Sequence, residues 1–165
     1  MRTKGFSIIE LLIVVAIILI IAAIAIPNLL SARIAANEAS ATSTMRTLNT
    51  SEFTYASSYN SGFSNDLHQL GTPGGGNQPT INNADLVDPI LAGNGPMGSA
   101  TSFTKNGFVF TYSHAGQTYP QISAYFLNGD PMLRGASGQR SFYTDQSGVV
   151  RCNSMATASG SDNPI

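Results

Sequence analysis

The chain enters its most apolar segment through Lys4-Gly5-Phe6-Ser7-Ile8-Ile9-Glu10-Leu11-Leu12-Ile13-Val14-Val15. From Phe6 to Ile26 only Ser7 and Glu10 are polar, and Pro27 follows directly. A helix over this run rises about 1.5 Å per residue and reaches about 32 Å, close to the bilayer's hydrocarbon thickness of about 30 Å. The segment therefore predicts a membrane-spanning helix.

The residues before this helix are basic. Arg2 and Lys4 carry positive charge, and no acidic residue precedes Glu10. Positive flanks stay on the cytoplasmic side, so we expect a single-pass protein with its C-terminal body outside the cytoplasm. Three interpretations share this pattern. They are a secretory signal peptide cut after Ala23-Ile24-Ala25, a plain membrane anchor, and a prepilin segment that is cut before the apolar run and keeps its helix.

Glu10 distinguishes these interpretations. A carboxylate inside an apolar helix costs about 2.5–3.5 kcal/mol at the bilayer centre and less near the helix end. A signal peptide or a plain anchor has no use for this group. Cleavage after Gly5 would instead create a cationic amine at Phe6, four residues before Glu10. In a bundle of such helices, Glu10 of one subunit can neutralise the Phe6 amine of its neighbour, and this buried pair also sets the stagger between subunits.

The segment resembles the class III signal of type IV pilins and type II secretion pseudopilins. In that family the prepilin peptidase requires a glycine before the cleaved bond, the aromatic residue after it is N-methylated, and the carboxylate is the fifth mature residue. Gly5, Phe6 and Glu10 match these positions one by one, and Pro27 matches the proline that kinks the helix in many members. The detailed match covers roughly residues 2–40.

The resemblance implies a structural function and no catalytic site. We expect a bacterial inner-membrane precursor with a periplasmic head, which polymerises with copies of itself. Its partners would be the prepilin peptidase and N-methyltransferase, an inner-membrane assembly platform and minor pilins. The filament would be a surface pilus serving adhesion, motility or DNA uptake. One alternative is a periplasmic pseudopilus that drives type II secretion, and a distant one is a soluble secreted protein with an ordinary signal peptide.

The helical pattern continues beyond the membrane. Pro27 predicts a kink or local melting, because it removes one backbone donor. Apolar residues then recur every seven positions at Ile34, Ala41, Leu48 and Tyr55, with a second row at Met45, Glu52 and Tyr59. The predicted organisation is a leader (1–5), a transmembrane and filament-core helix (6–26), its amphipathic continuation (27–60) and a globular head (61–165), with Gly62 ending the helix.

The sequence of the head predicts a loop-rich region followed by a small antiparallel sheet of three to four strands. Asp85 could cap a short helical turn reaching Leu91. The strand signals are Phe108–Tyr112, Ile122–Leu127, Ser141–Thr144 and Val149–Arg151, with turns at 128–131 and 146–148. A long helix packed on this sheet gives an α+β fold. The small polar residues from Ser154 to Ile165 predict a frayed tail.

The sequence gives little support for nucleic-acid binding, a disulfide, a catalytic histidine or a metal site. The net charge of −1 offers no basic surface for nucleic acid. Cys152 is the single cysteine and cannot form an internal disulfide, and His68 and His114 are isolated, as expected of loop histidines. Asp130 and Asp145 are weak calcium candidates, because calcium needs six to eight oxygen ligands and these predicted turns offer two carboxylates. We therefore expect no cofactor.

Overall fold

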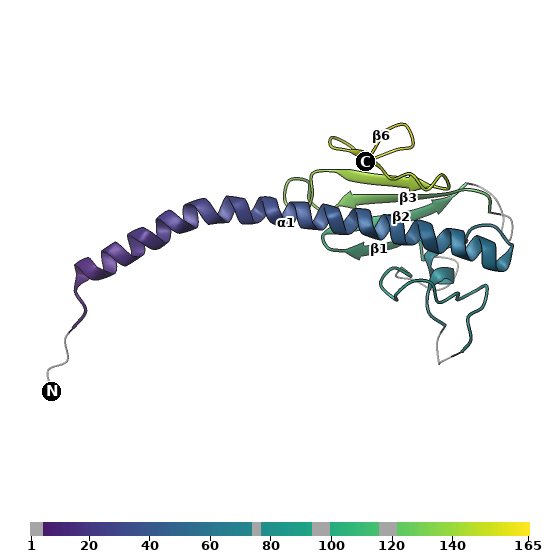
Figure 1. The fold of residues 1–165 in the computed structure, drawn as a ribbon, viewed down its shortest axis with the longest axis horizontal. Coiled ribbons are helices and arrows are strands. Elements are labelled where there is room, and N and C mark those ends of the chain that lie inside the picture. The colour runs from purple at the N-terminus through teal and green to yellow at the C-terminus, as the bar shows by residue number, and fades with distance from the viewer. Residues whose placement is uncertain (1–4, 74–76, 94–99, 116–121) are drawn as a thin grey trace. The chain divides into compact units, whose positions relative to one another are not determined.

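The fold is described from a computed structural model that covers residues 5–73, 77–93, 100–115 and 122–165. The chain divides into two compact units, Met1–Arg33 and Ile34–Ile165. Helix α1, Ile8–Tyr59, supplies the described secondary structure of the first unit and continues into the second. The six strands that the described residues form all belong to the second unit (Figure 1).

Helix α1 is longer than the membrane alone requires. It continues through Pro27 without interruption, so the local melting considered from the sequence does not occur, while a kink at this residue stays a prediction. The helix ends at Tyr59, one residue before the predicted end of its amphipathic continuation at residue 60. Its terminating residue is Asn60, which takes the left-handed conformation with φ of 49°, rather than Gly62. Gly62 has a different role, because an added Cβ would lie 2.3 Å from the Ile122 carbonyl oxygen.

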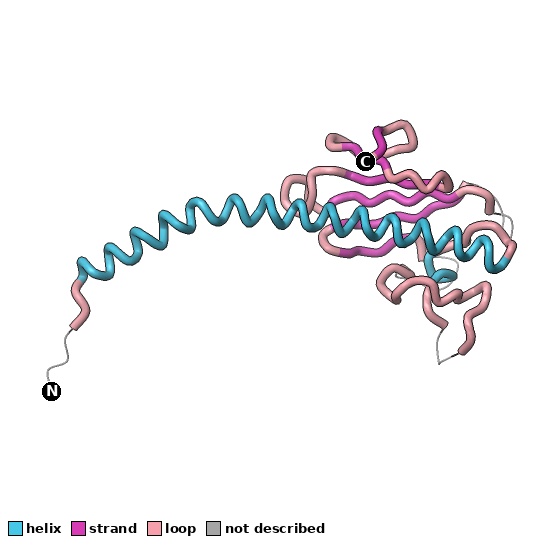
Figure 2. The backbone as a smooth tube through the Cα atoms, in the orientation of Figure 1, coloured by secondary structure: helices cyan, strands magenta, loops and turns pink. Residues whose placement is uncertain are grey.

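The sheet is an antiparallel meander in which each strand pairs with the next along the chain (Figure 2). The strands that the described residues form are β1 (Ser102–Lys105), β2 (Phe108–His114), β3 (Tyr125–Pro131), β4 (Ser141–Asp145), β5 (Arg151–Asn153) and β6 (Asn163–Pro164). The prediction of a helix on a small antiparallel sheet is confirmed. The strand number was too low, because β1 and β6 are short and carry little β-forming pattern of their own.

The core lies between the second half of α1 and one face of the sheet. Met45, Leu48 and Tyr55 of the helix are buried against alternating residues of the three central strands, namely Phe108, Phe110, Tyr125, Leu127 and Phe142. Because side chains alternate across a strand, the intervening residues of β2 and β3, such as Val109, Thr111 and Phe126, point to the opposite face. The predicted helical face at positions 41, 48 and 55 is therefore the face that packs on the head's own sheet.

The turn predicted at residues 128–131 is wrong, because Asn128-Gly129-Asp130-Pro131 forms the second half of β3. Gly129 is needed there for packing. An added Cβ would lie 2.8 Å from Met45 Cε and 3.0 Å from a Phe110 ring carbon, so glycine lets the helix approach the sheet closely. In this strand the absence of a side chain, rather than turn chemistry, explains the glycine.

Two predictions for the head's irregular segments are also wrong. The turn that precedes Leu91 is capped by Asp88, whose carboxylate accepts from the backbone N–H groups of Ile90 and Leu91 at 2.9 and 3.0 Å, and not by Asp85. The tail after Ser154 is held rather than frayed. Asn128 donates to the Ala158 carbonyl oxygen at 2.8 Å, and β6 pairs with β5.

Candidate functional site

The predicted cleavage junction, Gly5–Phe6, precedes the helix and is exposed. Neither residue is helical, and the Phe6 side chain is 77% exposed. A Cβ added to Gly5 would meet no atom within 4 Å. The chain's own fold therefore does not require glycine here, so any such requirement comes from a molecule that binds this segment. Arg2 and Lys4, the basic residues of the predicted leader, lie outside the described residues.

Glu10 is bound within its own chain in this structure. The Ser7 backbone N–H donates to Glu10 Oε2 at 2.9 Å, and the Leu11 N–H donates to the Ser7 carbonyl oxygen at 3.2 Å. The carboxylate thus satisfies one of the free N–H groups at the helix start, where the helix dipole also favours negative charge. Sequence reasoning missed this contact, although Ser-x-x-Glu before an apolar run is the signature of a capping box.

The apolar half of α1 is not covered by protein. By length and composition this helix could cross a membrane, with a mean hydropathy of 3.3 over its most apolar window, of which 0% is buried. Its exposed side chains include Ile8, Leu12, Ile17, Ile20, Ile24 and Leu29. Covering each such side chain contributes about 1.5–3 kcal/mol, so burial of this segment in lipid or against another protein is energetically favourable.

The two calcium candidates do not form one site. Asp130 lies in β3 beyond Gly129, whereas Asp145 ends β4 and pairs with Phe126. Asp145 lies opposite Phe126, which is four residues before Asp130 along β3. At 3.4 Å per residue the two aspartates are about 14 Å apart, too far to share one ion. Among the described residues no group of three or more histidine, cysteine, aspartate or glutamate side chains could hold a metal. Whether either residue binds calcium by itself is untested, and the expectation that the chain has no cofactor stays a prediction.

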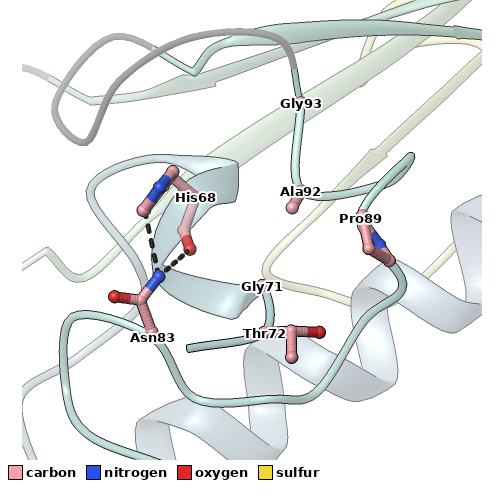
Figure 3. Close-up of a pocket in the computed structure, with 7 residues that line it drawn as sticks. All are labelled: His68, Gly71, Thr72, Asn83, Pro89, Ala92 and Gly93. Carbon is pink, nitrogen blue, oxygen red and sulfur yellow. Dashed lines mark hydrogen bonds between the residues drawn. The ribbon is translucent and has the colours of Figure 1, made fainter. Parts of the chain in front are cut away.

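A cavity of about 190 Å³ opens among the loops of the head, lined by residues that include His68, Thr72, Asn83 and Ala92 (Figure 3). The Asn83 side-chain nitrogen lies 3.2 Å from His68 Nδ1 and donates to the His68 carbonyl oxygen at 3.4 Å. His68 is hydrogen-bonded, as the sequence predicted, but it lies in a short 3-10 helix, Leu67–Leu70, rather than in a loop. No carboxylate of the described residues lines the cavity beside it. His114 instead ends strand β2.

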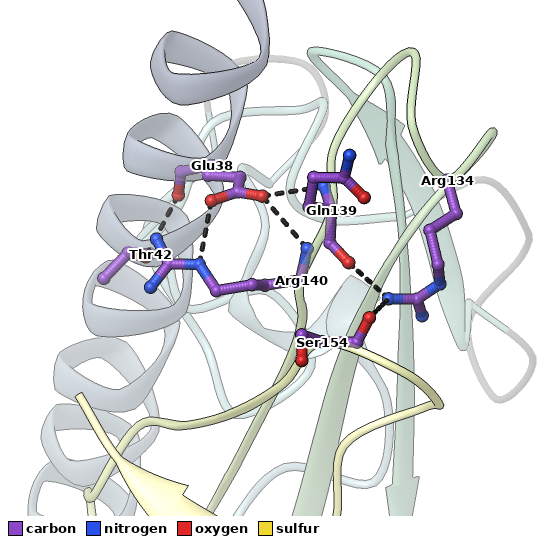
Figure 4. Close-up of polar contacts among 6 residues, drawn as sticks. All are labelled: Glu38, Thr42, Arg134, Gln139, Arg140 and Ser154. Atoms are coloured by element: carbon purple, nitrogen blue, oxygen red, sulfur yellow. Dashed lines mark hydrogen bonds and ion pairs between the residues drawn. The ribbon is translucent and has the colours of Figure 1, made fainter. Parts of the chain in front are cut away.

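A polar clamp joins α1 to the connection between β3 and β4. Glu38, only 7% exposed, accepts from the backbone N–H groups of Gln139 and Arg140 at 2.7 and 3.0 Å, and from Arg140 Nε at 2.8 Å (Figure 4). Burial opposes ionisation, but these donors and the Arg140 charge lower the pKa of Glu38. Sequence reasoning missed Glu38, although it lies seven residues before Met45 and so extends the row at 45, 52 and 59.

A second group of contacts secures the C-terminal segment. The Arg134 guanidinium donates to the carbonyl oxygens of Gln139, Ser154 and Ala156 and to the Ser141 hydroxyl. These acceptors come from two segments that are distant in sequence. Arg134 therefore closes the loop before β4 and holds the chain after β5, which positions the sheet's C-terminal edge.

Comparison with known proteins addresses the N-terminal segment. Residues 1–26 match the prokaryotic N-terminal methylation motif. Over 37 residues the chain is 65% identical to the type IV wide pilus major component PilA4 of Thermus thermophilus. This alignment covers 22% of the chain and 28% of that relative, so the similarity concerns the N-terminal segment and not the head. No solved structure matches the chain.

Proposed function

We propose that this chain is the structural subunit of a type IV pilus-like filament, cut after Gly5 and methylated on the new Phe6 amine. The observation that carries the proposal is the uncovered apolar half of α1 with Glu10 near its start. Lipid covers this segment before assembly, and the helices of other subunits cover it afterwards. The N-terminal match to a methylation motif and to a pilus component supports this interpretation.

The Glu10 carboxylate joins neighbouring subunits in this proposal. In the chain before cleavage, it binds the Ser7 N–H. Cleavage adds a cationic amine at Phe6, and a bundle of apolar helices excludes water from the carboxylate and the amine. A buried charge is tolerated when an opposite charge pairs with it, so the Phe6 amine of an adjacent subunit becomes the partner that Glu10 needs.

The proposal includes a membrane precursor with its basic end in the cytoplasm and its head on the periplasmic side. A prepilin peptidase and N-methyltransferase process it, and an inner-membrane platform assembles it together with minor pilins. These partners are inferred from the processing signal. The head contributes the filament's outer surface.

The sequence of the mature N-terminus tests the proposal. Mass spectrometry of the protein from its native membrane should find N-methyl-Phe6 at the N-terminus. A chain that begins at Ile26 would refute the proposed function and favour a secreted soluble protein. A Gly5→Val variant tests whether the prepilin peptidase recognises the glycine before the cleaved bond. It should remain uncut with the head's thermal stability unchanged, since a side chain at this position meets nothing in the fold.

Electron microscopy then separates the two kinds of filament. A surface pilus gives long fibres that disappear when this chain is deleted. A pseudopilus gives a secretion defect on deletion without visible fibres. We favour the pilus, since the relative that matches the N-terminal segment is a pilus component.

A further inference from the structure

One exposed stripe of α1 carries an unpaired cation. Arg46, Thr50 and Phe53 are spaced at i, i+4 and i+7, so they lie on one helix face, and all three are exposed. Phe53 is 46% exposed, which is high for a large aromatic residue beside a packed core. Arg46 has no carboxylate partner in the described part of the chain. We call Arg46 and Phe53 the basic patch.

A second exposed patch carries an unpaired carboxylate. Asp85 takes the left-handed conformation with φ of 55°, fixed by a hydrogen bond from its N–H to the Gly71 carbonyl oxygen at 2.9 Å. Within the described residues its side chain has no partner. Ile90, in the same loop, is 57% exposed. We call Asp85 and Ile90 the acidic patch.

Asp85 is unusual among the head's exposed aspartates. Asp88 lies 4.0 Å from Lys105 Nζ and caps a turn, while the Asp145 carboxylate accepts from the Ser147 N–H at 2.8 Å. Asp162 accepts from the Ser159 N–H at 2.7 Å. Each of these carboxylates is used by its own chain. Asp130 Oδ1 also has no partner among the described residues, but this atom is buried, whereas Asp85 is exposed and can meet an external cation.

The two patches lie on opposite flanks of α1. The loop that carries the acidic patch is held on one flank, where the Ser51 hydroxyl donates to the Leu86 carbonyl oxygen at 3.2 Å. The connection between β4 and β5 lies on the other flank, where Asn49 donates to the Gly148 carbonyl oxygen at 3.2 Å. Phe53 is one turn beyond Asn49 and faces this second flank, within 3.6 Å of a Cβ added to Gly148.

We propose that the basic patch of one subunit binds the acidic patch of a second copy of this chain, with Arg46 paired to Asp85 and Phe53 packed on Ile90. This inference rests on the proposed function and names the contact between heads. A contact between two different patches of one chain is heterologous. Each pair of bound copies therefore leaves one patch of each kind free, and in the proposed filament the contact repeats from subunit to subunit along an open helix. The charges are complementary, and the apolar pair supplies area that excludes water.

A charge exchange in the full-length chain tests the contact. Arg46→Asp and Asp85→Arg each place like charges at the contact, and each should lower the yield of sheared filaments about ten-fold or more. The double variant restores the pair with its polarity reversed and should recover most of the yield. Thr47→Asp is the matched control, because it adds a negative charge to the same helix at an exposed position off the stripe.

The outcomes distinguish this contact from the proposed function. Mature protein that begins at N-methyl-Phe6 and polymerises equally well in both single variants would refute the contact alone, as would a double variant no better than either single one. A mature chain that begins at Ile26 would refute the proposed function. The amount of membrane-inserted subunit should be equal in all variants, since neither side chain has a partner within the described part of its own chain.

Cross-linking gives a second measurement that does not depend on filament yield. A chain with Arg46→Cys and Asp85→Cys, in a Cys152→Ser background, is treated with a short bis-maleimide in intact cells. The heterologous contact predicts a ladder of multimers, and each single-cysteine variant should stay monomeric. A product that stops at the dimer, or a dimer from one cysteine alone, would overturn the proposed geometry.

Discussion

The buried carboxylate of Glu52 accepts two hydrogen bonds from Ser64, one from the backbone N–H at 2.9 Å and one from the hydroxyl at 2.6 Å. Glu52 is 1% exposed and has no Lys or Arg partner within the described residues. Burial raises the pKa of Glu52 to about 7 against the opposing effect of the Ser64 hydrogen bonds, and the charge of Asp66 raises it further. This contact joins α1 to the segment that follows it.

The stability of the head should therefore fall as the pH rises. In the unfolded chain Glu52 releases its proton near its ordinary pKa of 4.5, but in the fold it keeps the proton up to about pH 7. Between pH 4.5 and about pH 7 the folded state binds more protons than the unfolded state. The loss of folding stability therefore begins near pH 4.5 and is complete just above pH 7. The shift corresponds to about 3 kcal/mol at 1.36 kcal/mol per pH unit.

Thermal unfolding of the detergent-solubilised chain between pH 4.5 and 8 measures this effect. Glu52→Gln keeps an oxygen acceptor for Ser64 and removes the titration, so its unfolding midpoint should vary much less over this range. If wild type and variant showed the same pH profile, Glu52 would not be the group responsible.

The Glu38 clamp should stabilise the head more through its backbone contacts than through its ion pair. Glu38→Ala removes the charged acceptor of the Gln139 and Arg140 N–H groups and should cost about 1–3 kcal/mol, since a hydrogen bond to a charged group contributes about 1.5–3 kcal/mol and these part-buried donors can regain water. The Arg140 side chain is 46% exposed, so Arg140→Ala should cost only about 1 kcal/mol. Urea unfolding followed by tyrosine fluorescence measures both values.

Thr42→Ala is the control for the clamp. The Thr42 hydroxyl donates only to the backbone carbonyl oxygen of Glu38, at 3.0 Å, and its loss should change stability little. Equal losses for Glu38→Ala and Arg140→Ala would mean that the ion pair, and not the backbone contacts, dominates.

The sequence predicted the N-terminal half of the molecule better than the head. Periodicity and hydropathy act over neighbouring residues, so they located the end of α1 to within about one residue of Tyr59 and placed Glu10 on the helix. Helix continuity at Pro27 was harder to predict, because a proline removes one bond and the surrounding residues decide whether the helix survives.

Features of the head that depend on residues distant in the chain could not be predicted from local sequence patterns. Gly129 looked like a turn residue, but its role is set by Met45, which is 84 positions away in the chain. The clamp between Glu38 and Arg140 also joins residues 102 positions apart, and no local pattern connects them. Only the folded sheet brings such pairs together.

Arg134 should control the order of the C-terminal segment. Arg134→Ala removes the donor shared by Ser141, Ser154 and Ala156, so the residues after Asn153 should become sensitive to protease while the central strands stay protected. Limited proteolysis with mass spectrometry locates the new cuts. Arg134→Lys should rescue poorly, because an ammonium group cannot reproduce the planar arrangement of guanidinium donors. Full protection in Arg134→Ala would show that β6 pairing and the Asn128–Ala158 hydrogen bond hold the tail without Arg134.

Glu10 offers a test that separates charge from helix capping. Glu10→Ala removes both the acceptor for the Ser7 N–H and the negative charge, whereas Glu10→Gln can keep the cap because glutamine also serves at this position of a capping box. If the carboxylate acts by neutralising the Phe6 amine of a neighbour, both variants should be cut after Gly5 but give few filaments. An uncompensated buried charge costs about 3–5 kcal/mol, enough to lower filament yield by more than a hundred-fold.

Glu10→Ala and Glu10→Gln together separate the effect of the negative charge from the effect of the helix cap. Filament yield from sheared cells is measured beside the fraction of chain that begins at Phe6, so that a processing defect is not read as an assembly defect. Normal filaments from Glu10→Gln together with none from Glu10→Ala would assign the role of Glu10 to the helix start alone. Equal loss in both variants requires the negative charge itself, because glutamine retains the hydrogen bond and differs chiefly in being neutral.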